Sequence, residues 1–139
     1  MIKKIDHVGI QVSKEENLKF YEKLGFKEIK RNVREGKDLI VFMEGYGEIL
    51  EMFIGSNHPK RLSDPEAFGI KHLALTVDNV EDTLKELGVT EHGPIFFFDG
   101  VHVVFFSDPD GLPIELHEEE IYGWFITLFR TIIYRVFVR

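Results

Sequence analysis

The sequence predicts an α+β fold built from two β-α-β-β-β modules, at residues 3–54 and 69–118. Three observations support this prediction: the same order of strand-like and helix-like apolar spacing occurs twice, a turn-rich segment separates the two copies, and each copy opens on an Ile-x-His-apolar pattern. Two copies are too few for a solenoid. We therefore expect a pseudo-symmetric pair of modules whose strands form a curved mixed sheet around a cleft.

The first module begins with alternating apolar and polar residues at 3–12, which is typical of a strand. Ser13 then resembles a helix N-cap, and Glu16 would complete a capping box with it. Apolar side chains continue at helical spacing up to Gly25, where a C-cap glycine is expected. Three further strands are predicted, at residues 26–31, 38–43 and 48–54.

The second module repeats this order after a linker, residues 55–68, that is rich in Ser, Asn, Asp and Pro. A strand is predicted at 70–77, followed by a helix that begins at Asp78 or Asn79 and ends at Gly88. Strands at 94–98, 101–106 and 112–117 complete the module. The segment Ser107-Asp108-Pro109-Asp110-Gly111 has the composition of a turn between the last two of them.

Length and composition limit the classes of function. A chain of 139 residues fits one domain or two half-domains that share a core. Its net charge of -7 argues against a nucleic-acid-binding surface, which needs cations to neutralise phosphates. The chain has no cysteine, which excludes disulfides, thiolate metal sites and cysteine nucleophiles. Its first residues enter a strand pattern without the apolar core of a signal peptide, so we expect a cytoplasmic protein.

Residues 1–120 form the predicted domain, and residues 121–139 form an apolar tail that contains three arginines. Arg130, near the middle of the tail, would cost about 2.5–3.5 kcal/mol in a membrane, so a membrane span is disfavoured. We expect instead a helix that packs on the domain or on a partner chain. Alternatively, the tail is an addition to the two repeated modules and takes no part in the chemistry.

Two histidines and two glutamates occupy equivalent places in the two modules: His7 and Glu51 in the first, His72 and Glu115 in the second. A lone histidine on a strand is usually structural and a lone glutamate usually solvated. Glu51 and Glu115, however, each lie between two apolar residues, where a carboxylate is costly unless it is paired or bound to a metal. Imidazole nitrogens and carboxylate oxygens together suit Zn, Ni, Co, Mn or Fe. The repeat therefore predicts a divalent-metal site with these four ligands.

Several motifs resemble the vicinal-oxygen-chelate superfamily, which includes glyoxalase I, extradiol dioxygenases, methylmalonyl-CoA epimerase, and fosfomycin and bleomycin resistance proteins. The resemblance covers residues 3–118, and its most specific part is the Asp-Pro-Asp-Gly turn before the strand of Glu115. The similar segments read IDHVGI from Ile5, FYEKLGF from Phe20, IKHLALTV from Ile70 and SDPDGLPIEL from Ser107.

Within that superfamily a full His-Glu-His-Glu set resembles glyoxalase I, or lactoylglutathione lyase. The resemblance implies His7, Glu51, His72 and Glu115 as metal ligands. It implies a substrate whose vicinal oxygens chelate the metal, and a glutamate that moves a proton between neighbouring carbons through an enediolate. Glu115 is the first candidate for this base and Glu51 the second. A homodimer is implied as well, with the modules pairing within a chain or between chains.

Two positions depart from the pattern of bacterial glyoxalase I. Gln11 stands where those enzymes typically have an arginine that contacts glutathione, and Gly55 stands where they tend to have asparagine. The small-molecule substrate is therefore left open. The alternatives are a dioxygenase or an epimerase on the same fold, or a non-catalytic binder of the resistance type. Bleomycin-binding members lack the metal ligands, and dioxygenases have only three of them.

Other polar residues receive plainer interpretations. His58 is expected to be exposed in the linker, and His102 could line the cleft. His117 is expected beside Glu115 on the same strand face, and Glu118–Glu120 is expected to be a solvated run of charge. Asp38, Tyr46 and Phe53 could shape the pocket.

Overall fold

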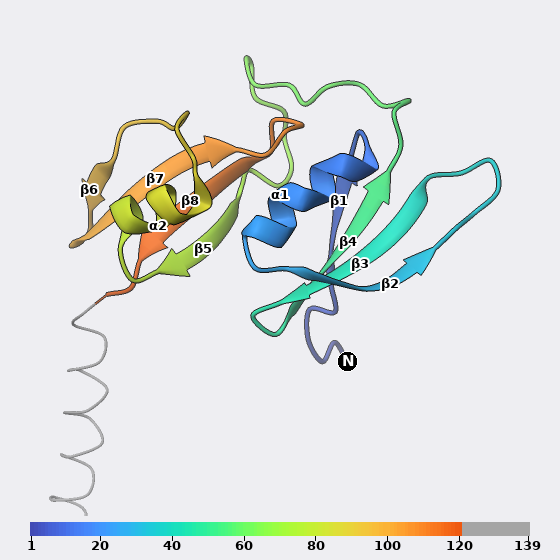
Figure 1. Ribbon diagram of the computed structural model, residues 1–139, viewed down its shortest axis with the longest axis horizontal. Helices are drawn as coiled ribbons and strands as arrows, with labels where there is room; N and C mark the ends of the chain where they lie inside the picture. Colours follow the sequence, from blue (N-terminus) through green and yellow to red (C-terminus); the bar gives the residue numbers. More distant parts are fainter. Residues whose placement is uncertain (121–139) are drawn as a thin grey trace, which may run out of the picture. The chain divides into compact units, whose positions relative to one another are not determined.

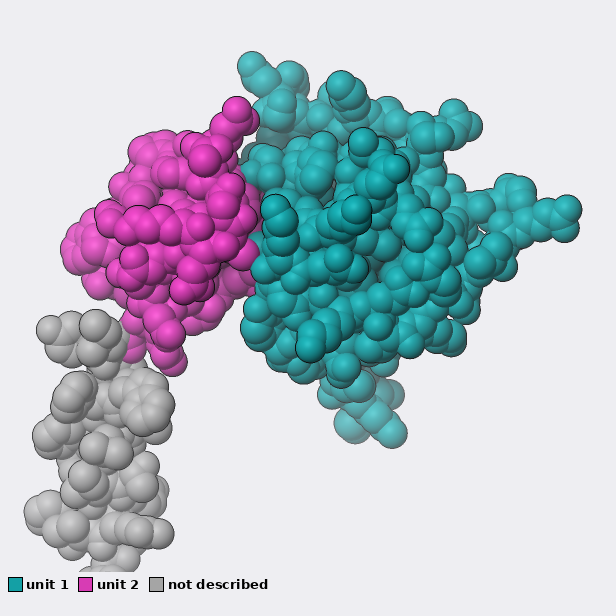
Figure 2. Space-filling model, in the orientation of Figure 1, with its two compact units in different colours: residues 1–71, 107–113 teal, residues 72–106, 114–139 magenta. Residues whose placement is uncertain are grey.

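The computed structural model describes residues 1–120, so the predicted tail lies outside the described residues. Two four-stranded mixed sheets are present, in the orders β1-β4-β3-β2 and β5-β8-β7-β6 (Figure 1). The described chain divides into two compact units (Figure 2): unit 1 contains residues 1–71 and 107–113, and unit 2 contains residues 72–106 and 114–120. No helix among the described residues is long and apolar enough to cross a membrane.

Unit 1 follows the predicted β-α-β-β-β order. Its elements are β1 (Val8–Val12), the 3-10 helix η1 (Glu15–Asn17), α1 (Leu18–Lys23), β2 (Lys27–Asn32), β3 (Leu39–Gly45) and β4 (Glu48–Ile54). Strand β1 pairs parallel to β4, and the β2–β3 and β3–β4 pairs are antiparallel. Helix α1 covers one face of this sheet (Figure 1). Buried side chains of helix and sheet form the core there, among them Tyr21, Val41 and Met52, which are fully buried.

Unit 2 has the same order, with the second helix and four strands. Its elements are β5 (Leu73–Val77), α2 (Val80–Leu87), β6 (Phe96–Phe98), β7 (Val101–Ser107) and β8 (Pro113–Glu118). Strand β5 pairs parallel to β8. The predicted caps of α2 are confirmed: the Asn79 side chain accepts a hydrogen bond from Asp82 N–H, and Gly88 ends the helix in the left-handed conformation. The α+β class and the paired modules are thus confirmed.

Two local predictions for unit 1 were wrong. The first strand begins at Val8, which pairs with Leu50, rather than at residue 3. In this parallel register residues 3–5 would fall beyond Glu48, where β4 begins after a turn in which Tyr46 and Gly47 have positive φ, so they have no partner strand. Ser13 is not an N-cap. Its N–H donates instead to Asp110 Oδ2 at 2.9 Å, and its hydroxyl accepts from Asn17.

Strand β6 consists of three phenylalanines, Phe96, Phe97 and Phe98. They are exposed within the described chain, at 51–72%. Strand β6 is the edge of its sheet and pairs only with β7, so neither of its faces is packed into the core of unit 2.

Candidate metal centre

His7 and Glu51 meet in unit 1. His7 directly precedes β1, and Glu51 lies in the middle of β4, where it pairs with Gly9. His7 and Gly9 are two residues apart, so their side-chain positions fall on the same face of the sheet as Glu51. His7 Nε2 lies 3.0 Å from Glu51 Oε2, and the glutamate side chain is only 16% exposed.

His72 and Glu115 repeat this arrangement in unit 2. His72 directly precedes β5, and Glu115 pairs with Ala74, two residues after the histidine. His72 Nε2 lies 2.9 Å from Glu115 Oε2, and the glutamate is 13% exposed. Each histidine thus occupies the same register position relative to its glutamate. Small residues, Gly9 and Ala74, stand opposite the two carboxylates.

The donor atoms of each pair fit a metal ion. Two ligand atoms that bind one ion at right angles, each at about 2.1 Å, lie about 3 Å apart. That is the spacing of Nε2 and Oε2 in both units. No group of three or more His, Asp or Glu side chains at metal-binding spacing is present within residues 1–120. Each unit holds one imidazole and one carboxylate about 3 Å apart.

The second nitrogens of the two rings differ in their surroundings. His7 Nδ1 lies 3.0 Å from Asp6 Oδ2, and this hydrogen bond is the main reason that the pKa of His7 is raised; burial opposes the rise and Glu51 adds to it. Carboxylate contacts of this kind orient metal-binding imidazoles, leaving Nε2 for the ion. His72 Nδ1 is buried and has no hydrogen-bond partner among the described residues. The sequence did not predict the contact between Asp6 and His7. Both residues were expected on a strand, where adjacent side chains point to opposite faces.

Aromatic rings lie beside both histidines. The ring of Phe42 on β3 stands edge-on to His7, with centroids 6.5 Å apart. The ring of Phe105 on β7 contacts His72 in the same way at 5.5 Å. Phe42 pairs with Glu51 in the β3–β4 register and shares its face of the sheet. These rings give each His–Glu pair an apolar neighbour.

Two other histidines of unit 2, His102 and His117, lie close to Glu118. His102 Nδ1 and N–H both bond to Glu118 Oε2, at 2.8 and 3.1 Å, and His117 Nδ1 lies 2.9 Å from the Glu118 carbonyl oxygen. Glu118 was predicted to be solvated, and this was wrong, because its side chain is 14% exposed. It also accepts the Val80 N–H at the start of α2. Burial raises the pKa of Glu118, but the hydrogen bonds from Val80 and His102 lower it overall.

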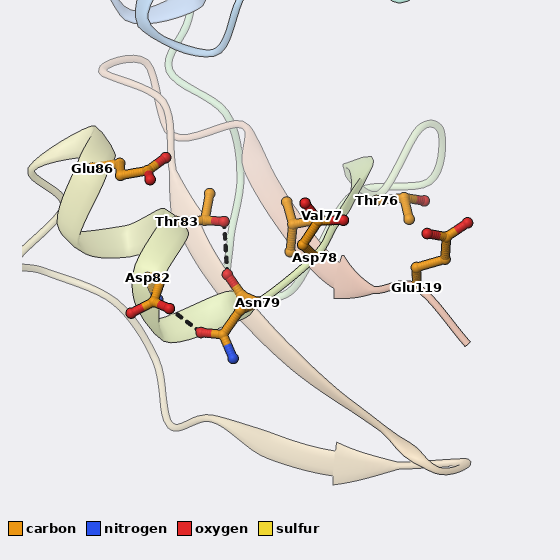
Figure 3. Close-up of a pocket in the computed structure, with 8 residues that line it drawn as sticks. All are labelled: Thr76, Val77, Asp78, Asn79, Asp82, Thr83, Glu86 and Glu119. Atoms are coloured by element: carbon orange, nitrogen blue, oxygen red, sulfur yellow. Dashed lines mark hydrogen bonds between the residues drawn. The ribbon is translucent and has the colours of Figure 1, made fainter. Parts of the chain in front are cut away.

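A cavity of about 510 Å³ opens where β5 runs into α2 (Figure 3), and none of the four predicted metal ligands lines it. Half of its lining residues are acidic. The dashed bonds in Figure 3 are those of the helix cap, from Asp82 N–H to Asn79 Oδ1 and from the Thr83 hydroxyl to the Asn79 carbonyl oxygen. The cavity is lined by Thr76, Val77, Asp78, Asn79, Asp82, Thr83, Glu86 and Glu119.

His58 and Asp38 form a pair that the sequence did not indicate. His58 reaches from the linker to Asp38, with Nε2 2.8 Å from Oδ2. The hydrogen bond from His58 is the main cause that lowers the pKa of Asp38; burial opposes it, and Gln11 contributes further. His58 is therefore paired as well as exposed. Gly55, which directly follows β4, was the one indication in the sequence, because a glycine there leaves room for the Asp38 side chain.

The pKa of Asp38 provides a direct test of this pair. Replacing His58 with alanine is expected to raise it toward the ordinary value of 3.8, measured by carboxyl-carbon NMR titration. A lowered pKa stabilises the folded state above the pKa of the unfolded chain, and this contribution is lost as the pH falls through the folded-state pKa. His58→Ala should therefore reduce the loss of stability on the acid side. Lys60→Ala, in the same linker, should leave the titration unchanged; an unchanged titration in His58→Ala would contradict the pairing.

Comparisons with known proteins agree with this architecture. The family model for the glyoxalase/bleomycin resistance protein/dioxygenase superfamily matches residues 4–116. The uncharacterized protein YwkD of Bacillus subtilis (strain 168) is 37% identical over 129 residues, which cover 86% of this chain and 99% of that protein. A glyoxalase family protein of Enterococcus faecalis is 41% identical with a TM-score of 0.74, over 84% of this chain and 98% of that one.

A more distant structure shares the fold. It is a mutant of the fosfomycin resistance protein FosX of Listeria monocytogenes, complexed with Mn(II) and 1S,2S-dihydroxypropylphosphonic acid. It is 20% identical with a TM-score of 0.65, and the match covers 90% of this chain and 99% of that one. The family model spans nearly all of residues 1–120, and the relatives match over almost their full length. The chain therefore belongs to the glyoxalase/bleomycin resistance protein/dioxygenase superfamily.

Proposed function

We propose that this protein is a divalent-metal-dependent lyase or isomerase of the glyoxalase I type. The observation that carries the proposal is the repeated His–Glu pair, with Nε2 and Oε2 3.0 Å apart in unit 1 and 2.9 Å apart in unit 2. In this proposal His7, Glu51, His72 and Glu115 are the protein ligands of one Ni, Zn, Co, Mn or Fe ion. The Mn(II) in the FosX complex is consistent with a divalent ion on this fold.

Glutamate is the group that moves the proton. When bound, the ion supplies Lewis acidity, which makes a C–H bond beside a substrate carbonyl more acidic. Glu115 takes this proton and returns it to the neighbouring carbon, so one C–H bond breaks and another forms. The hydroxyl proton of the substrate passes to the former carbonyl oxygen, so no atom is lost. Glu51 is the second candidate for this role. A dioxygenase would use only three protein ligands. It would not explain why Glu51 and Glu115 have equivalent positions, each beside a histidine.

Metal content is the first test of the proposal. Purified protein, stripped of metal and then titrated with each candidate ion, is expected to bind a stoichiometric amount, measured by elemental analysis and calorimetry. His7→Ala and His72→Ala should each weaken binding by at least about 10–100-fold, because each removes a ligand rather than its supporting partner. His92→Ala is the control, since His92 contacts only the Gly93 carbonyl oxygen among the described residues. Wild-type protein that binds none of these ions would overturn the proposal.

A further inference from the structure

One end of the unit 1 sheet carries a polar cluster, the Asp38 corner, made of Gln11, Asp38, Gly55 and His58. Asp38 directly precedes β3 and Gly55 directly follows β4, and the pairing of Leu39 with Ile54 brings these two strand ends together. Gln11 lies four residues after His7 on the same side of β1, about 13 Å along the strand. The corner therefore shares a sheet face with His7 and Glu51.

The Nε2 donors of Gln11 and His58 are already used. Gln11 Nε2 donates to the Phe53 carbonyl oxygen at 2.8 Å and to Asp38 Oδ2 at 3.3 Å. His58 Nε2 donates to the same Asp38 oxygen at 2.8 Å. Arg34 donates Nε and Nη2 to the Asp38 carbonyl oxygen, and its charge also helps to lower the pKa of the Asp38 carboxyl group. Because a carbonyl oxygen can only accept, the bond to Phe53 fixes the amide of Gln11 with its oxygen pointing away.

The atoms that remain are acceptors. Asp38 Oδ1 and Gln11 Oε1 receive no hydrogen bond within residues 1–120. The Asp38 side chain is 28% exposed and that of His58 is 41% exposed, so solvent reaches both. A ligand group that completes this cluster must therefore donate hydrogen bonds.

Gly55 makes the corner possible. A Cβ at position 55 would overlap with Asp38 Oδ1 and crowd the rest of that carboxyl group. Position 55 does not need glycine for its φ, which is not positive. The absence of a side chain is thus explained by the space that the Asp38 carboxylate occupies. Gln11 and Gly55, the two departures from the glyoxalase I pattern, both contact this one carboxylate.

We infer that the Asp38 corner selects substrates whose distal end carries a hydrogen-bond donor, most strongly an ammonium group, and disfavours substrates that end in a carboxylate. Asp38 is the specificity-determining residue, because a charge-assisted hydrogen bond to its carboxylate is about twice as strong as a neutral one. A carboxylate end group cannot donate a hydrogen bond to Asp38 Oδ1 or Gln11 Oε1. This inference rests on the proposed function, because that proposal places the reacting end of the substrate at the metal ligands.

The test uses three thiols of matched length that differ only in their end group: 6-aminohexanethiol, 6-mercaptohexanol and 6-mercaptohexanoic acid. Their stable S-(2-hydroxypropyl) thioethers are titrated into the full-length, metal-free protein, and binding is followed by NMR at the backbone amides of Gln11, Asp38 and His58. The amine is expected to bind about tenfold more tightly than the acid, with the alcohol between them. Equal binding of amine and acid, tighter binding of the acid, or no shift at these amides would overturn the inference.

Variants then assign the preference to Asp38. Asp38→Asn should reduce the tenfold preference to about twofold or less, because an amide retains one acceptor but loses the charge. Glu22→Gln, which makes the same charge change on the exposed side of α1, should leave the preference intact. A preference that survives in Asp38→Asn would contradict the role of that residue. The spectra also show whether each variant is folded.

Activity separates this inference from the proposed function. With metal-loaded protein, the methylglyoxal hemithioacetals of the three thiols should show the same order in kcat/KM. If no hemithioacetal is isomerised, the proposed function fails while the binding order still decides the inference. If all three are isomerised equally and bind equally, the proposed function stands and the inference fails.

Discussion

Replacing Glu115 with glutamine is expected to lower kcat for the proposed isomerisation by about 10²–10⁴-fold, the range typical of losing a general base. Glutamine has nearly the same shape as glutamate and keeps one carbonyl oxygen beside His72 Nε2, so β8 and the apolar residues around position 115 should pack as before. The change removes the ability to accept a proton at that position. Rates measured on hemithioacetal substrates, together with the metal content of each preparation, provide the test.

Glu51→Gln is the matched control, because Glu51 has the same register position in unit 1 and a similar exposure of 16% against 13%. If Glu115 is the base, Glu51→Gln should lower kcat less than Glu115→Gln once both proteins are loaded with the same ion. A larger loss in Glu51→Gln would transfer the role to Glu51. Unchanged kcat in a metal-loaded Glu115→Gln protein would exclude Glu115 as the base while leaving its role as a ligand open.

The order of the elements was predictable because each module repeats a simple apolar pattern. Strand β4 was predicted at residues 48–54 and is found at Glu48–Ile54, since alternating residues of this strand face either the core or the His–Glu side of the sheet. Strand β1 was predicted too long, because periodicity continues past the point where a partner strand ends. The cap at Ser13 failed for a similar reason: Asp110, nearly a hundred residues away in sequence, takes its N–H.

The candidate site was predictable only in part. The pairs His7–Glu51 and His72–Glu115 could be found from the repeat, because equal register in equal modules gives equal neighbours. Asp6, Asp38 and Glu118 could not. The contact of Asp6 with His7 depends on a side-chain rotamer. Asp38 meets His58 at a strand end, and Glu118 accepts a hydrogen bond at the start of a helix. None of these contacts follows from the spacing of apolar residues in the sequence.

Replacing Asp108 with alanine is expected to lower the free energy of unfolding by about 3 kcal/mol. Asp108 is 4% exposed, and its carboxylate accepts three hydrogen bonds: from the Tyr21 hydroxyl at 2.6 Å, from Asp110 N–H at 2.9 Å and from Leu112 N–H at 2.7 Å. Alanine leaves all three donors without this acceptor. The Tyr21 hydroxyl suffers most, because the tyrosine is fully buried and water cannot replace the lost partner.

Tyr21→Phe separates the contribution of the tyrosine bond from that of the turn. It removes the hydroxyl but keeps both backbone bonds to Asp108, so it should cost only about 1–1.5 kcal/mol. In the double variant the two losses should not add, and the coupling, measured by urea denaturation, should be about 1–2 kcal/mol. A cost below about 1 kcal/mol for Asp108→Ala would mean that the turn finds other acceptors. Strict additivity would mean that the Tyr21–Asp108 bond contributes little, and the stability of unit 1 would then depend on the apolar packing of Tyr21 rather than on its hydroxyl.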